Sequence, residues 1–211
     1  MRKPLKQQGF TLYMVLILMA VIAILVLAGG QMLNTEMRIS SNDADRKYAF
    51  GLAEDALRNG EVYTYENVHK TKVLADPTIV AATQPKDFFG VIGAGKIFTN
   101  DCTNGLCAPS IEEVTNTPSV AAGNAYVGTP AWERTGTVGG KQVSVFDINN
   151  KSIEYNLGGN ANVSKMPRYI VEYLGPAEDA GSILYRVTAR AWGKNQNTQV
   201  TLQSVVRMPK I

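Results

Sequence analysis

Gly9-Phe10-Thr11-Leu12-Tyr13 is the stretch of sequence that decides the fold, because it joins a short basic leader to a long apolar run. Three basic residues precede this junction: Arg2, Lys3 and Lys6. After it, seventeen consecutive residues, Leu12 to Ala28, are apolar or aromatic, and no charged residue appears before Glu36. This pattern predicts an apolar helix whose basic end faces the cytoplasm.

The apolar run is long enough to serve as a membrane anchor. At 1.5 Å of rise per residue, a helix over residues 10–30 roughly spans a ~30 Å hydrocarbon core. A secretory signal peptide is the alternative, because Ala28-Gly29-Gly30 is similar to a small-residue cleavage site. Against it, the run exceeds the usual apolar region of roughly 7–15 residues and continues into further helix. We therefore expect residues 12–28 to cross the membrane.

The junction and the block Ala53 to Glu61 together resemble a type IV prepilin. A basic leader ending in Gly9 is followed by Phe10 and an apolar helix, and the block is similar to the stem-end motif of the PilX/PilK branch of minor pilins. The resemblance implies cleavage by prepilin peptidase between Gly9 and Phe10, with methylation of Phe10. It further implies a single pass through the inner membrane, a domain in the periplasm, and later transfer to the pilus tip at the cell surface.

Met14 departs from the pattern of most pilins, which carry Glu as the fifth mature residue. The PilX/PilK minor pilins and the tip pseudopilins of type II secretion also lack that Glu, so Met14 is the residue expected to determine the place in assembly. The resemblance implies a minor pilin that primes type IV pilus assembly, in a tip complex. The implied partners are other minor pilins, the major pilin, prepilin peptidase and the inner-membrane assembly platform.

Composition and pattern divide the chain into five segments. The last three, residues 31–211, are expected to form one globular domain. The expected segments are a leader (1–9), the transmembrane half of a helix (10–30), its amphipathic stem (31–60), a loop-rich region (61–140) and an antiparallel sheet (141–211). The fold class is α+β and pilin-like, with the helix packed on the sheet.

The stem has an apolar stripe at helical spacing, and Asn59-Gly60 is expected to end it as a left-handed C-cap. Small residues on the stripe allow close approach to the sheet, and larger ones fill the interface. The residues expected to pack on the sheet are Ala44, Tyr48, Leu52, Ala53, Ala56 and Leu57.

The segment after Gly140 contains stretches rich in β-branched and aromatic residues, separated by Gly, Asn and Pro turns. Strands are expected within 141–146, 152–155, 168–174, 182–192 and 198–207. The last two form the clearest hairpin, with one mainly apolar face that needs the helix as a cover.

Residues 61–140 are rich in Thr, Asn, Gly and Pro, and few long elements are expected there. Ser110-x-x-Glu113 is a capping box that predicts one short helix. A second is expected over Val73 to Ala82, interrupted by Pro77.

Cys102 and Cys107 are the two cysteines of the chain. In the oxidising compartment outside the inner membrane a local disulfide is expected, with Asn104-Gly105 as the turn between the thiols. A metal site needs more ligands than two thiols, and the single histidine, His69, has no obvious companion in the sequence. No metal or other cofactor is therefore expected.

The sequence provides little support for catalysis or nucleic-acid binding. Gly90 to Lys96 fits the first seven positions of a phosphate-binding loop, but Ile97 replaces the Ser or Thr that binds magnesium. Carboxylate pairs such as Asp43 with Asp45 are interpreted as solvated surface charge. The net charge is +3, and removing the three basic leader residues leaves 3 − 3 = 0, so no nucleic-acid partner is expected.

Two further function classes remain open. One is a membrane-tethered or tip-located adhesin or DNA-capture module that works through residues 61–140, and the other is a tip pseudopilin of type II secretion. Survival of surface or DNA binding in the isolated domain would favour the adhesin, and loss of pili on deletion would favour assembly. The chain shows no run of acidic calcium ligands of the kind tip pseudopilins use.

Overall fold

The computed structural model describes residues 10–83, 90–93, 95–110, 129–158, 161–177 and 181–210. The chain divides into two compact units, Met1–Ala44 and Asp45–Ile211. The described part of the first unit belongs to helix α1, and the second unit contains the sheet. As expected from the sequence, the fold class is α+β.

Helix α1 (Phe10–Tyr63) extends beyond the end that the sequence predicts. The chain remains helical through Asn59-Gly60 and continues as the π-helix η1 (Thr64–Val73), so the expected C-cap is wrong. A Cβ atom at Gly60 would lie 2.6 Å from Cγ1 of Val187 and 3.1 Å from Cδ2 of Tyr169. Gly60 therefore occupies this position because the sheet approaches the helix backbone, and not because the backbone turns left-handed.

The short helix α2 (Pro77–Val80) follows η1. Asp76 caps its N-terminus, accepting a hydrogen bond from the Thr78 backbone N–H at 2.9 Å. Pro77 stands in the first turn, where its missing N–H costs nothing. The helix expected over Val73 to Ala82 is thus shorter than predicted. Pro77 begins α2 and does not interrupt a longer helix.

In the part of the chain that the structure describes, the main sheet has five strands. Its central pair is β5 (Arg168–Pro176) with β6 (Ser182–Trp192), followed by β7 (Gln199–Pro209) in an unbroken antiparallel hairpin. Two short strands pair with β5 on its other side: β1 (Leu106–Cys107) in parallel and β4 (Ile153–Glu154) antiparallel. The sheet is therefore mixed, where the sequence predicted an antiparallel one, because β1 comes from the disulfide loop of the middle region.

A second, two-stranded sheet joins β2 (Thr135–Val138) to β3 (Lys141–Ser144). It stands between two 3-10 turns, η5 (Ala131–Glu133) and η6 (Val145–Asp147), while η3 (Thr103–Gly105) lies in the disulfide loop. The expected helix with the Ser110-x-x-Glu113 capping box lies outside the described residues apart from Ser110.

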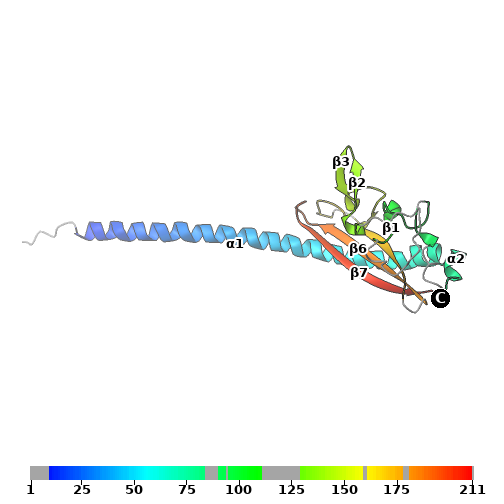
Figure 1. Cartoon of the computed structure of the whole chain (residues 1–211). Helices are drawn as coiled ribbons and strands as arrows, with labels where there is room; N and C mark the ends of the chain where they lie inside the picture. The colour runs from blue at the N-terminus through cyan, green and yellow to red at the C-terminus, as the bar shows by residue number, and fades with distance from the viewer. Residues whose placement is uncertain are drawn as a thin grey trace, which may run out of the picture. The chain divides into compact units, whose positions relative to one another are not determined.

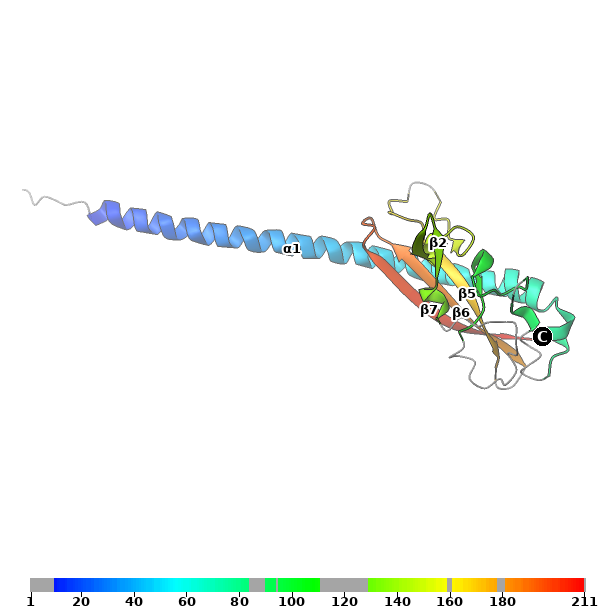
Figure 2. The ribbon, with the colours of Figure 1, turned by 45° about the horizontal axis from the view of Figure 1, so that its top comes forward.

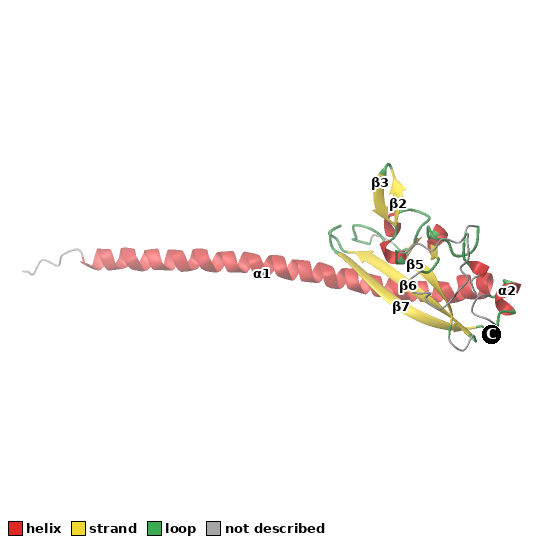
Figure 3. Cartoon of the chain, in the orientation of Figure 1, coloured by secondary structure: helices red, strands yellow, loops and turns green. Residues whose placement is uncertain are grey.

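The sheet is covered on both faces of its central strands. On one face, side chains such as Tyr169 and Tyr185 form the main core with α1, η1 and α2. On the other, Ile170 and Trp192 pack with Phe146 of η6 and the disulfide. Figure 1 and Figure 2 show the part of α1 that follows Asp45 on one side of the sheet and residues 131–147, here the β2–β3 lobe, on the other. The sequence pattern predicted a single buried face, and in the β6–β7 hairpin it is β7 that keeps that alternation, whereas β6 is buried on both faces. Figure 3 shows β7 beside β6 in the sheet.

Candidate functional site

The first part of α1 exposes every large apolar side chain that the structure describes there. Between Phe10 and Leu27 the exposed fractions of these side chains run from 45% to 70%, and Met14 is 54% exposed. One span in the described chain, Phe10–Ala28, is long and apolar enough to cross a membrane. An exposed apolar surface of this size marks a membrane or protein interface, and its length supports a membrane anchor. Gly9, the expected cleavage residue, lies outside the described residues.

The part of α1 that follows Asp45 instead packs its small residues on the sheet. Ala49, Ala53 and Ala56 are completely buried, Leu52 is 9% exposed, and Leu57 packs against the main core. Ala53 and Leu52 share a cluster with Ala191 of β6. Of the other residues expected to pack here, Ala44 is exposed and Tyr48 keeps 38% of its surface exposed.

Asp45 binds the turn between β6 and β7, a role that the sequence did not reveal. Its carboxylate accepts hydrogen bonds from the backbone N–H groups of Lys194 at 2.7 Å and Asn195 at 3.2 Å. The Thr198 side chain, followed by these amides, lowers the pKa of Asp45. A Cβ atom at Gly193 would come within 2.4 Å of the carboxylate. Asp45 is therefore a structural contact, where the sequence predicted only solvated charge.

His69 has two companions that are distant in sequence, the buried Tyr185 and the backbone of Pro209. Its Nδ1 atom lies 3.0 Å from the Tyr185 hydroxyl, and its Nε2 atom lies 2.7 Å from the Pro209 carbonyl oxygen. A carbonyl only accepts, so Nε2 donates its proton and Nδ1 accepts from the hydroxyl in the neutral ring. Burial lowers the pKa of His69, against the opposing effect of the Pro209 carbonyl. The histidine thus joins η1 to the ends of β6 and β7, because Tyr185 and Pro209 belong to those strands.

The expected disulfide between Cys102 and Cys107 is present, and both residues are completely buried. Cys102 adopts a left-handed backbone conformation with φ of 57°, which the tight loop requires. Beside it, burial would raise the pKa of Asp101, but hydrogen bonds from Lys151, Thr99 and Thr103 outweigh that effect and hold the pKa well below its usual range. The loop is therefore fixed by covalent and polar contacts together.

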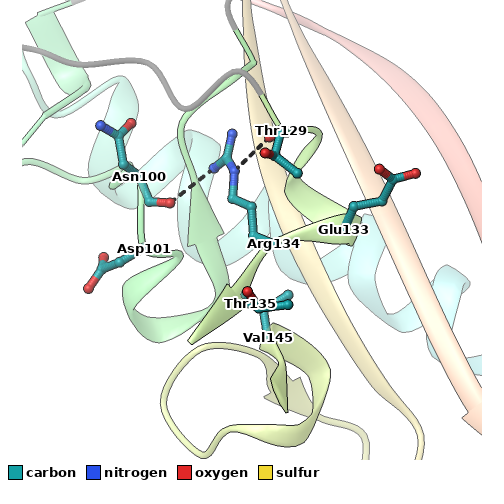
Figure 4. A pocket seen from close by; sticks show the side chains of 7 residues that line it. All are labelled: Asn100, Asp101, Thr129, Glu133, Arg134, Thr135 and Val145. Carbon is teal, nitrogen blue, oxygen red and sulfur yellow. Dashed lines mark hydrogen bonds between the residues drawn. The ribbon is translucent and has the colours of Figure 1, made fainter. Parts of the chain in front are cut away.

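A pocket beside the disulfide loop is built around Arg134, which is 4% exposed. The Arg134 guanidinium donates to the carbonyl oxygens of Thr129 at 3.0 Å and Asn100 at 3.3 Å, and Nη1 lies 3.8 Å from the Cys102 sulfur. Figure 4 shows the guanidinium between the segments that carry Asn100 and Thr129. Arg134 thus binds the β2–β3 lobe to the disulfide loop. The sequence offered no signal for this role, since the bonded carbonyls belong to no motif.

The described residues bear on two questions that the sequence raises, a metal site and the form of the segment Gly90 to Lys96. Within the described ranges, no group of three or more His, Cys, Asp or Glu side chains gathers to hold a metal ion. The chain around Gly93 forms a turn in which Lys96 donates its backbone N–H to the Gly93 carbonyl, and Ile92 pairs with Phe98. This segment is therefore a turn whose flanking residues Val91, Ile92 and Phe98 belong to the main core.

The chain combines an apolar N-terminal helix with an α+β domain. Two protein-family models match it. The model of the type IV pilus assembly protein PilX C-terminal region matches residues 103–208, and the PilX N-terminal model matches residues 8–58. The first match alone spans half of the 211 residues. The chain belongs to the PilX family of type IV pilus assembly proteins. No curated protein and no solved structure matches it.

The family assignment places the protein in type IV pilus assembly. The family is structural and not catalytic, which is consistent with the expectation that the chain is not an enzyme. It also indicates contact with other pilus components and a location in the cell envelope.

Proposed function

We propose that this protein is a minor pilin that primes type IV pilus assembly and stays at or near the tip in few copies. The observation that carries the proposal is Met14, the fifth residue counted from Phe10, in a segment without a carboxylate before Glu36. The proposal includes cleavage by prepilin peptidase after Gly9, and it places the domain in the periplasm before assembly.

The physical reason is the cost of an unmatched charge in a membrane. In the pilin family, the fifth-residue Glu is thought to neutralise the N-terminal amine of the adjacent subunit already in the filament. An unpaired charge near the bilayer centre costs at least ~2.5–3.5 kcal/mol. A subunit with Met14 offers no such partner. The first subunit of a filament has no earlier neighbour to satisfy, so it escapes this cost.

The partners follow from the same argument. The amine of Phe10 would be neutralised by a Glu-bearing minor pilin that is added next, and the major pilin would follow. The exposed apolar half of α1 is the surface available for these contacts and for the inner-membrane assembly platform.

Immunogold labelling of sheared pili tests the proposal, in cells whose own copy of the gene is replaced by variants. We expect wild-type label at filament ends and loss of pili on deletion. Met14→Glu should keep pili and add label along the shaft, because the variant satisfies its neighbour. Met14→Leu, which keeps the site apolar, is the matched control and should remain at the tip. Abundant wild-type label along the shaft would contradict the tip assignment.

A further inference from the structure

The two edges of the main sheet are different in length. On one side the sheet ends in β1 and β4, which have two residues each. On the other it ends in β7, which pairs with β6 through eleven consecutive residues without a bulge. Among the residues that the structure describes, no strand pairs with the outer edge of β7. Figure 1 and Figure 2 both show β7 at the margin of the sheet.

The contacts at the two ends of β7 show which of its backbone groups face outward. The Thr198 carbonyl accepts from the Gly193 N–H, and the Lys210 N–H donates to the Gly181 carbonyl, so both residues bond towards β6. The register between them is unbroken, and backbone direction alternates along a strand. The odd-numbered residues therefore direct their N–H and C=O groups away from β6: Gln199, Thr201, Gln203, Val205 and Arg207.

The C-terminal end of this edge is closed. Pro209 has no N–H, and its carbonyl accepts a hydrogen bond from His69 Nε2 at 2.7 Å. Proline and bound side chains are devices that prevent strand addition. Between Gln199 and Met208 the strand has no proline, no bulge and one charged residue, Arg207. This long edge therefore lacks most of the protection that its last residue has.

The hairpin that carries this edge has a strongly one-sided charge. Residues 181–210 contain five basic side chains and no carboxylate. The basic residues are Arg186, Arg190, Lys194, Arg207 and Lys210. Glu172 of β5 approaches Arg186 at 3.3 Å, but it is 1% exposed and lies on the far side of β6. Carboxylates of other elements also act on these cations: Glu172 pairs with Arg186, Asp147 acts on Arg190, and Asp45 lies at Lys194. A strand that adds beside β7 would still meet a hairpin that itself contributes only positive charge.

We propose that the outer edge of β7 accepts, by strand addition, an extended carboxylate-bearing segment of another pilus subunit. Backbone hydrogen bonds to Thr201, Gln203 and Val205 hold the segment. Its acidic side chains lie on the face of Arg190 and Arg207, and its apolar ones extend the half-buried row of Val200, Leu202 and Val206. Pairing with a second copy is disfavoured, because it brings two basic hairpins together. The inference does not depend on where in the pilus the subunit stands.

The first test measures peptide binding to the full-length protein in detergent, by fluorescence anisotropy. The probes are an alternating Val-Glu heptapeptide, the Val-Lys counterpart, and a Val-Glu peptide with a central proline. Favourable cross-strand charge pairs predict at least about tenfold tighter binding of the Val-Glu probe than of the Val-Lys probe. The proline probe should bind weakly. Equal binding of all three peptides would overturn the inference.

The matched variants are Gln203→Pro and Gln203→Ala, which both remove the side-chain bond from Gln203 to Thr188. Only Gln203→Pro removes the outward N–H, and it breaks no bond to β6. We expect Gln203→Pro to abolish Val-Glu binding and Gln203→Ala to keep it, with similar thermal unfolding of the two. If both variants retain binding, strand addition is wrong. If Gln203→Pro does not fold, the comparison of the three peptides on the wild-type protein still decides.

The second test identifies the occupant in piliated cells. A photocrosslinking amino acid replaces Val205, which is 58% exposed, or Val138 of β2, which is 52% exposed and serves as the control. We expect Val205 to crosslink to an acidic, extended segment of another pilus subunit, with loss of the product in the Gln203→Pro background. Crosslinks to a second copy of this chain, to a basic segment, or equally from Val138 would overturn the inference.

Discussion

The two parts of helix α1 have opposite surroundings, although they are parts of one element. Before Asp45 the described large apolar side chains are exposed, from Phe10 to Leu27 and again at Met37 and Ile39. After Asp45 the small residues Ala49, Ala53 and Ala56 are completely buried. Residues 12–28 of the first part are apolar on all sides, and the second part has one small-residue stripe with charges elsewhere. Side-chain size and placement, more than helicity, therefore decide whether a helix segment contacts lipid or packs on the sheet of its own domain.

Leucine truncation in the two parts should produce the largest contrast. Leu52 is 9% exposed, and Leu52→Ala should lower the free energy of unfolding by about 2–4 kcal/mol, through lost burial and the cavity left behind. Leu25 is 65% exposed, and Leu25→Ala should change domain stability by less than about 0.5 kcal/mol. Urea unfolding of the full-length protein in detergent measures both. Similar losses for the two variants would contradict the comparison.

Glycine replacement within the second part should show opposite signs at two positions. A Cβ atom at Gly60 meets Cγ1 of Val187 at 2.6 Å, so Gly60→Ala should destabilise the domain by about 1–3 kcal/mol. Gly51 has nothing within 4 Å, so Gly51→Ala should stabilise it by up to ~1 kcal/mol, through helix propensity. The same unfolding assay measures both variants. A stabilising Gly60→Ala would show that the sheet does not approach the helix there.

The pH dependence of stability should show whether the buried packing of the second part of α1 continues into η1, which carries His69. Burial lowers the pKa of His69 in the folded protein, so below about pH 6.5 the unfolded chain takes up a proton that the folded protein resists. This contribution to stability is complete above that pH, and it is lost as the pH falls towards the folded-state pKa. The urea midpoint of the wild type should therefore fall more between pH 8 and pH 5 than that of His69→Gln. Parallel curves for the two proteins would exclude His69 as the source.

Local patterns in the sequence predicted much of this protein. The apolar run of residues 12–28 is a matter of composition and length, and Cys102 and Cys107 are only 5 residues apart. The β6–β7 hairpin follows from alternation and a short turn. These features depend on neighbours in the chain, so a single sequence contains the information. The resemblance to PilX, carried by the junction and the block 53–61, agrees with the matched PilX family, whereas the PilK type stays a prediction.

Only the tertiary structure decided the contacts between distant residues. Asp45 and the turn at Lys194 are 149 positions apart, and His69 and Tyr185 are 116 apart. The same holds for Gly60, which the sequence assigned to a C-cap because Asn-Gly usually ends a helix. There the helix continues past Gly60, where Val187 approaches its backbone closely. No local sequence pattern predicts such an approach. Local propensity decides which elements form, while long-range packing decides where they end and which polar groups they bring together.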